Sequence, residues 1–324
     1  MYFLFLVFDF LYAPNGTISV KSSIKFETIL HDFRQNNKKH IMRKILLTLI
    51  LFIFATGTYA QDKKYSHWND EWLHIKHPTI EVSYGITKTK LDGFSARFEN
   101  VSLADIKLGF SNEIYEHRKE DFHKYVYPYF NFGNVSSDLD SREKTAGNLK
   151  SSSWRFGFGR KEGYPINLGG QFSILPYTSS TMTWTRLDMK SLPDSSNLTD
   201  MNRLLLYDKA FRFGSSWDGG LNINFTKNFA INAGYERANT YQRYLFWKQT
   251  GSMIVEEVGV GLIDEFVKSI LHREPVAGSI VNFLLKNAYY FGVYQLRSKE
   301  MNWPFGGEAA LNFDSFKFGF TVTF

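Results

Sequence analysis

The chain contains no cysteine and only 8 prolines among its 324 residues. The absence of cysteine excludes disulfide frameworks and thiolate-bound metals. The scarcity of proline, together with 31 Phe and 18 Tyr in a chain that is 17% aromatic, favours β-strands over helices. Long apolar runs are also scarce, and after residue 60 no stretch resembles a transmembrane helix.

The net charge of +6 is unevenly distributed along the chain. Residues 1–60 carry 7 Lys and Arg against 3 Asp and Glu, so 31 of 38 basic and 29 of 32 acidic residues remain, a net +2. Most of the basic excess therefore lies in a segment that we expect to be removed. Nucleic acid is not expected as a partner.

That segment has the three parts of a secretory signal peptide. Met42-Arg43-Lys44 is a short basic start, residues 45–54 are apolar, and Thr58-Tyr59-Ala60 offers a small-residue cleavage site. The apolar run is too short to span a bilayer comfortably. We predict a start at Met42, a signal peptide over residues 42–60, an upstream extension at 1–41, an N-terminal segment at 61–76 and a β-domain over 77–324.

The last nine residues alternate strictly between apolar and polar or small side chains. The apolar parity holds Phe316, Phe318, Phe320, Val322 and Phe324. Such alternation is typical of a strand with one face toward lipid and the other toward a barrel lumen. The final strand ending in Phe resembles the C-terminal signal that bacterial assembly machinery reads in outer-membrane β-barrels. This resemblance implies an outer-membrane location, with membrane lipid and the assembly machinery as partners.

Similar alternation recurs from residue 80 onward, and the pattern resembles small outer-membrane barrels in general rather than one specific family. We predict an antiparallel transmembrane barrel of about eight strands, with ten as the alternative. The clearest hairpin lies in residues 211–246, across Thr226-Lys227-Asn228. Residues 308–313 and 316–324 are counted as a last hairpin across Asp314-Ser315, with one bulged strand as the alternative. Residues 117–150 are predicted mainly as loop, although 125–132 could form a strand interrupted by Pro128.

The lumen-facing parity is polar and charged. It is the first place to look for function, and its candidates are Glu81, Asp105, Lys107, Arg155, Asn222, Asn224, Asn232, Glu236 and Lys317. An eight-stranded barrel is only wide enough for its own side chains, so we expect these residues to pair into a closed core. With ten or twelve strands the same residues would line a narrow pore.

Residues 253–291 break the β-pattern. Apolar residues recur there at spacings of three and four, which predicts two amphipathic helices separated at His272-Arg273-Glu274-Pro275. We expect the apolar stripe to pack against the barrel wall or within the hairpin. The alternatives are a plug in the lumen, a membrane-surface helix or a docking surface for a protein partner. Strand parity and the short turn at residues 226–228 disagree on the side of the insert, which stays open.

No motif predicts a catalytic residue, a metal site or a cofactor. Gly259-Val260-Gly261 lies in a predicted helix and lacks the third glycine of a phosphate loop. His117, Glu120, Asp121 and His123 are interpreted as a solvated charged loop, and His67, His74 and His77 as part of an interfacial aromatic segment. The leading hypothesis is a structural, binding or interaction barrel of the cell envelope. The alternatives are a narrow channel for small solutes, a lipid-modifying enzyme and a soluble periplasmic β-protein.

The signal-peptide prediction is tested by sequencing the N-terminus of the protein after expression in a bacterium that exports it. We expect the mature chain to begin at Gln61, because small residues precede this position. A mature chain that still begins at Met1 or Met42 would contradict the prediction.

Overall fold

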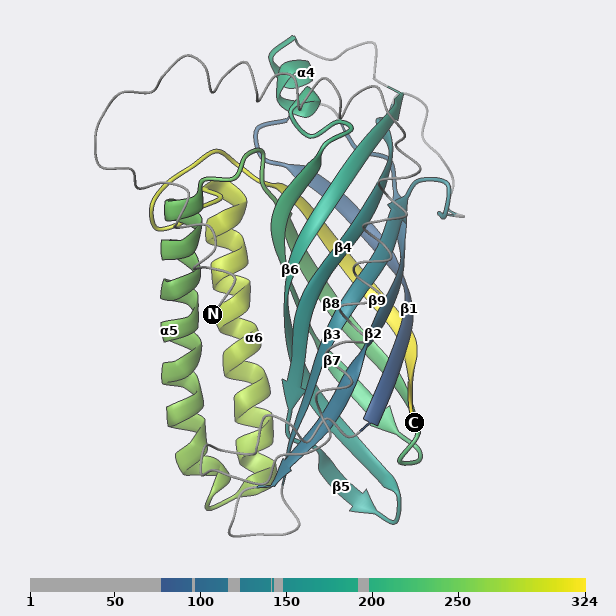
Figure 1. Cartoon of the computed structure of the whole chain (residues 1–324), viewed down its shortest axis with the longest axis vertical. Helices are drawn as coiled ribbons and strands as arrows, with labels where there is room; N and C mark the ends of the chain where they lie inside the picture. Colours follow the sequence, from purple (N-terminus) through teal and green to yellow (C-terminus); the bar gives the residue numbers. More distant parts are fainter. Residues whose placement is uncertain (1–76, 95–96, 116–122, 141, 143–147, 192–197) are drawn as a thin grey trace, which may run out of the picture. The chain divides into compact units, whose positions relative to one another are not determined.

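The computed structural model describes residues 77–94, 97–115, 123–140, 142, 148–191 and 198–324. Long antiparallel strands form a barrel with two helices beside it (Figure 1). The strands are β1 (His77–Leu91), β2 (Val101–Tyr115), β3 (His123–Ser136), β4 (Lys150–Gly163), β5 (Ile166–Gly169), β6 (Phe172–Ser191), β7 (Phe211–Asn224), β8 (Phe229–Thr240) and β9 (Leu311–Thr323). The helices are α4 (Leu198–Leu205), α5 (Phe246–Leu271) and α6 (Pro275–Lys299).

Eight of these strands close on themselves. The neighbours run β4-β3-β2-β1-β9-β8-β7-β6, and pairing between β4 and β6 completes the ring. The four-residue β5 pairs only with the first residues of β6 and extends the sheet beyond the ring. Closure gives every strand of the ring a hydrogen-bonded neighbour on both sides, as a membrane-spanning sheet requires. The expected eight-stranded antiparallel barrel is confirmed.

The set of eight strands differs from the expected set in two places. Residues 123–136, predicted mainly as loop, form β3. Pro128 is accommodated because the pairing of β2 with β3 passes from Gly109 opposite Tyr129 to Asn112 opposite Val126. Its nitrogen has no hydrogen to donate, so a break in the ladder is where a strand tolerates proline.

The expected last hairpin is wrong, because residues 311–323 form one strand. The register of β9 with β1 is continuous from Leu311 opposite Leu91 to Thr323 opposite Thr79, so Asp314-Ser315 is neither a turn nor a bulge. The apolar parity changes because the surroundings of the inward side chains change along the strand. Leu311 and Phe313 point into an apolar part of the lumen, whereas Lys317 points into a polar part. The predicted number of strands is nevertheless eight, because β3 was not counted and β9 was counted as two strands.

A single β9 resolves the conflict over the helical insert. The turn between β7 and β8 and the last residue, Phe324, lie at the same end of the barrel, here called the turn end (Figure 1). Phe324 N donates to Pro78 O, and Thr323 N donates to Asn228 O, which joins these segments at that end. The opposite, loop end carries α4, and the helical hairpin leaves and returns there.

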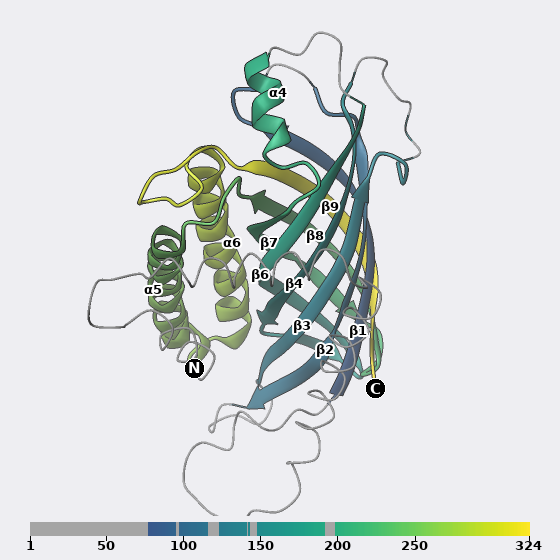
Figure 2. The same cartoon turned by 45° about the horizontal axis from the view of Figure 1, so that its top comes forward.

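The two long helices form an antiparallel hairpin, and α6 lies between α5 and the barrel in both views (Figures 1 and 2). Together they extend beyond the predicted insert of residues 253–291, because α5 begins at Phe246 and α6 ends at Lys299. None of the described helices is long and apolar enough to cross a membrane. The expectation that the apolar stripe packs locally is wrong for much of α5: Val258, Leu262 and Phe266 are exposed, whereas Gln249, Ser252 and Glu256 are buried.

An apolar cluster, here called the cap, fills the loop end of the lumen. Inward side chains from the strand ends meet loop residues there, and most of the cluster is almost fully buried. Its buried members are Leu91, Val101, Leu103, Val135, Leu149, Leu187, Leu204, Tyr207, Ala238, Leu311 and Phe313. Tyr207 also donates a hydrogen bond of 3.2 Å to the carbonyl of Ala309, which fixes one loop over the cap.

The cap should contribute substantially to stability. Leu103 is 0% exposed, so Leu103→Ala should lower the free energy of unfolding by about 2–5 kcal/mol through lost burial and a residual cavity. The matched Leu168→Ala, on β5 where the side chain is 57% exposed, should change it by less than about 0.5 kcal/mol. Urea unfolding followed by tryptophan fluorescence measures both. Equal losses would contradict a packed cap.

Candidate functional site

The candidate residues lie on the inner face of the barrel. Eight of the nine have a relative exposure of only 2–3%, and Asn224 is partly buried near the turn end. Those eight are Glu81, Asp105, Lys107, Arg155, Asn222, Asn232, Glu236 and Lys317. The lumen is therefore polar where the core of a soluble protein is apolar.

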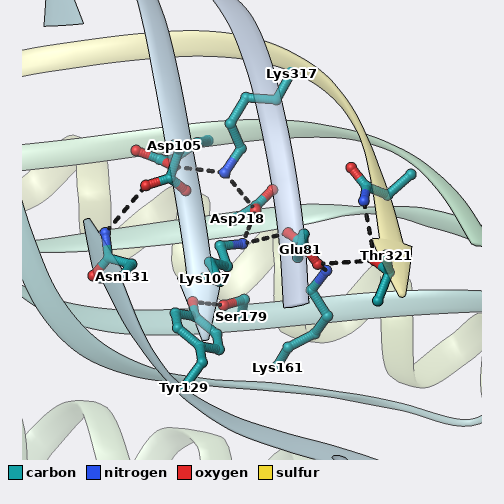
Figure 3. Close-up of polar contacts among 12 residues, drawn as sticks. Glu81, Asp105, Lys107, Tyr129, Asn131, Lys161, Ser179, Asp218, Lys317 and Thr321 are labelled. Atoms are coloured by element: carbon teal, nitrogen blue, oxygen red, sulfur yellow. Dashed lines mark hydrogen bonds and ion pairs between the residues drawn. The ribbon is translucent and has the colours of Figure 1, made fainter. Parts of the chain in front are cut away.

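Charged side chains in the middle of the lumen form one continuous series of ion pairs, here called the ion chain. It begins at Lys161 of β4, whose ammonium pairs with Glu81 of β1. The other oxygen of Glu81 accepts a hydrogen bond from Lys107 Nζ at 2.9 Å, and Lys107 lies directly opposite Glu81 on β2. Figure 3 shows Glu81 between the two lysines. Each lysine thus neutralises part of a carboxylate that has almost no access to water.

The ion chain continues across the lumen to the other side of the barrel. Lys107 Nζ lies 3.2 Å from Asp218 Oδ2 on β7, and Lys317 Nζ lies 2.8 Å from the same oxygen (Figure 3). Lys317 also lies 2.7 Å from Glu236 of β8, which pairs with Arg155 Nη1 at 2.5 Å. Acidic and basic residues alternate throughout, so every charge has an opposite charge beside it.

The two remaining strands of the ring supply aromatic and hydroxyl groups. Tyr177 of β6 donates to Asp218 at 3.3 Å, and its ring lies 4.0 Å from Lys161 Nζ. On β3, the hydroxyl of Tyr129 is 2.7 Å from that of Thr181, and its ring lies 4.9 Å from Lys107 Nζ. Tyrosine rings attract ammonium groups, so these contacts add to the ion pairs. All eight strands therefore contribute to one polar core.

The lumen is also balanced in charge. Asp105, which accepts a hydrogen bond from Asn131 at 3.5 Å, is the fourth acidic residue beside four basic ones. The acidic residues are Glu81, Asp105, Asp218 and Glu236, and the basic ones are Lys107, Arg155, Lys161 and Lys317. A neutral and mutually paired set is expected where desolvation makes an unpaired charge costly.

Glycines leave the room that these long side chains need. A Cβ on Gly234 would lie 2.3 Å from the hydroxyl of Tyr177 and 2.7 Å from a carboxylate oxygen of Asp218. A Cβ on Gly159 would lie 2.8 Å from the ring of Tyr129. All three distances are shorter than van der Waals contact, so side chains at these two inward positions would displace the polar core.

Two members of the ion chain were not among the predicted candidates. Lys161 lies near the end of β4, which continues through it to Gly163. Asp218 shares the inward parity of Asn222 and Asn224, so extending the predicted strand by two steps of two residues would have found it. The lumen-facing pattern was therefore visible in the sequence at Asp218 but hidden at Lys161 by the preceding Arg160.

A polar cavity of about 600 Å³, here called the vestibule, lies at the turn end. Its lining includes His77, Glu113, His123 and Asn224. His123 lies 3.6 Å from Glu113. His117, Glu120 and Asp121, which the sequence groups with His123, lie outside the described part of the chain. His67 and His74 lie outside it as well. Within the described ranges, no group of three or more His, Cys, Asp or Glu could hold a metal ion.

The outer face of the ring has the opposite polarity. Large apolar side chains are exposed on most strands, among them Ile80, Ile106, Leu108, Phe110, Phe132, Trp154, Phe158, Ile231, Phe316, Phe318 and Phe320. Neighbouring rings stack, as between Phe132 and Trp154 with centroids 5.2 Å apart. Of the predicted assembly signal, Phe316, Phe318, Phe320 and Phe324 are exposed and Val322 is half-buried. Its role in assembly stays a prediction.

A closed antiparallel ring that is charged inside and apolar outside has the architecture of a transmembrane β-barrel. The described strands form an eight-stranded antiparallel barrel with this architecture. No protein-family model matches it, and no curated protein matches its sequence.

Three solved structures resemble this chain at 10–13% sequence identity. Neisserial surface protein A is 10% identical, with 77% of this chain and 99% of that chain covered and a TM-score of 0.36. Ail, the attachment invasion locus protein of Yersinia pestis, is 10% identical, with 76% and 98% covered and a TM-score of 0.30. OprG from Pseudomonas aeruginosa is 13% identical, with 76% and 95% covered and a TM-score of 0.24. Similarity at this level concerns the barrel fold alone.

Neutralising one member of the ion chain should destabilise the barrel. Asp218→Asn leaves Lys107 and Lys317 without a shared counter-charge, and we expect a loss of about 3–5 kcal/mol in the free energy of unfolding. Glu308→Gln is the matched control: its partner Arg243 is exposed, so the loss should be at most about 1 kcal/mol. Urea unfolding in lipid vesicles measures both variants.

A compensating variant separates charge balance from packing. Adding Lys107→Met to Asp218→Asn removes one basic and one acidic residue together, and Glu81 keeps Lys161 as its partner. The double variant should regain part of the lost stability, because the net charge of the lumen returns to zero. No recovery, or an Asp218→Asn variant as mild as Glu308→Gln, would contradict the role of the ion chain.

Proposed function

We propose that the protein is an outer-membrane barrel with a sealed lumen, which acts as a structural, binding or interaction protein of the cell envelope and conducts no solutes. The apolar outer face supports this location, because it would be unstable in water but is matched by acyl chains. Residues available to partners then lie at the loop end and at the vestibule, the two ends that reach the aqueous phase.

The observation that carries this proposal is the succession of two barriers along the lumen. The cap closes the loop end with buried apolar side chains such as Leu103 and Phe313. The ion chain fills the middle, and its successive ion pairs from Glu81 to Arg155 have N–O distances of 2.5–3.2 Å. Opening a path would require breaking buried ion pairs and displacing the cap.

The channel hypothesis is tested by single-channel recording in planar bilayers. We expect the folded wild-type protein to give no conductance steps, because neither barrier leaves space for hydrated ions. A porin added to the same bilayer serves as the positive control for detection. Flotation of the protein with liposomes, and its recovery in the outer-membrane fraction of expressing cells, show that a silent bilayer reflects a closed barrel.

Discrete steps from the wild-type protein would contradict the sealed lumen. Steps that arise only after the cap is opened, as in a Leu103→Ser and Phe313→Ser double variant, would support the cap as a barrier. Recovery of the wild-type protein in the soluble periplasmic fraction would instead contradict the membrane location.

A further inference from the structure

The helical hairpin of α5 and α6 has its polarity reversed relative to a helix on a soluble protein. Its buried face carries many polar side chains beside apolar ones such as Val267 and Val293: α6 buries Ser279, Asn282, Lys286 and Arg297, and α5 buries Gln249, Ser252 and Glu256. Its exposed face carries large apolar side chains. An amphipathic helix in water buries its apolar face, so this arrangement indicates different surroundings.

The barrel wall beneath the hairpin carries small and polar residues around the buried Trp217. Outward positions of β6 and β7 carry Thr178, Ser215 and Gly219 here. Asn287 of α6 donates to Thr178 at 2.9 Å, and a Cβ on Gly219 would lie 1.8 Å from Asn287 Oδ1. The helix therefore approaches the wall closely and supplies hydrogen bonds to it.

Two clusters of charge fix the hairpin to the wall. In the first, Glu256 of α5 accepts a hydrogen bond from Trp217 Nε1 of β7 at 2.7 Å and pairs with Arg297 of α6 at 2.7 Å. In the second, Lys286 of α6, 1% exposed, pairs with Glu162 of β4 and with Asp264 of α5 at 2.6 Å. Each cluster joins both helices and one strand, so the hairpin and the wall form one packed unit.

The exposed face of the hairpin is continuous with the apolar belt of the barrel. The Arg237 guanidinium lies 4.6 Å from the ring of Phe291 of α6 and 4.7 Å from the ring of Tyr235 of β8. Exposures reach 70% at Leu262 and 56% at Leu284. The apolar set comprises Ile254, Val255, Val258, Leu262, Phe266, Val276, Ile280, Leu284, Leu285, Phe291 and Leu296. A soluble surface rarely carries so large an apolar patch.

The two ends of the hairpin resemble the two interfaces of a bilayer. At the loop end, Tyr244, Phe246 and Trp247 form an aromatic cluster, and Trp247 is 76% exposed. At the turn end, His272, Arg273 and Glu274 form a charged tip. Aromatic residues are enriched at membrane interfaces and charged residues beyond them. At 1.5 Å per residue, a helix of 26 residues is about 39 Å long, which exceeds the bilayer core of about 30 Å.

Two exposed acidic residues on α5 fit this arrangement. Glu265 lies six residues before the end of the helix, about 9 Å from the charged tip. Glu257 borders the polar face, next to the buried Glu256. Glu265 is thus close to the charged tip, and Glu257 is close to the polar contacts between the hairpin and the barrel wall.

We propose that lipid acyl chains cover the exposed face of the hairpin, so that α5 and α6 lie against the barrel wall at the level of the membrane. The ion pairs and hydrogen bonds between the hairpin and the barrel wall then form in an apolar medium, where water does not compete for them. This proposal rests on the proposed membrane location of the barrel. A second copy of the chain or a protein partner on the same face would be a different outcome.

The absence of cysteine allows single spin labels to test the proposal in the full chain. Leu262→Cys and Leu284→Cys place labels on the two helices, and both side chains are exposed, so folding should be retained. Phe318→Cys labels the apolar belt of the barrel, and Lys227→Cys labels the turn between β7 and β8. Collision rates with oxygen, which partitions into lipid, and with a water-soluble nickel chelate are measured by electron paramagnetic resonance in vesicles.

We expect the oxygen-to-nickel ratio at positions 262 and 284 to match that at 318 and to exceed that at 227 several-fold. Water-like ratios on both helices with a lipid-like ratio at 318 would overturn this proposal and leave the membrane location intact. Water-like ratios at all four positions would overturn both. Low collision rates with both reagents at positions 262 and 284 would also overturn the proposal, because protein would then cover the labels. Dipolar broadening between labels would identify this protein as a second copy of the chain. Without dipolar broadening it would be a different protein partner.

Discussion

The constraint on which the structure depends is the small interior of an eight-stranded ring. Because such a ring encloses room only for its own side chains, every inward charge must find its partner among the other inward residues. The ion chain meets this requirement: Asp218 serves two lysines, and Glu236 serves Lys317 and Arg155. Strand order and register bring together residues that are more than 200 positions apart in the chain, such as Glu81 and Thr321.

The same physical requirement shapes the outside of the barrel. Over outward groups such as Thr178 and Glu162, the helical hairpin covers the wall with complementary polar side chains. Lys286 and Glu162 do outside the ring what Lys107 and Glu81 do inside it: they bury opposite charges against each other. The chain thus contains two polar interiors separated by one sheet, and both outer surfaces are apolar.

Much of the barrel and part of the candidate site followed from alternation alone. The period of two in strands assigned Glu81, Lys107 and Lys317 to the same face, because a strand fixes the direction of each side chain from its parity. The rule that polar side chains point inward failed where the lumen changes from polar to apolar. Phe313 is inward although it is apolar, since the cap needs apolar residues, and the sequence pattern alone could not distinguish that change from a turn at Asp314-Ser315.

The sequence by itself determined that the chain forms a ring of alternating strands with a helical insert, because periodicity is local and survives without knowledge of neighbours. Only the tertiary structure decided which charges meet, whether the lumen is closed, and which face of the hairpin is buried. These properties depend on distances between residues far apart in the chain. The buried Lys286 shows the reason: its burial follows from Glu162 on β4 and Asp264 on α5, and neither partner is predictable from the helix that carries it.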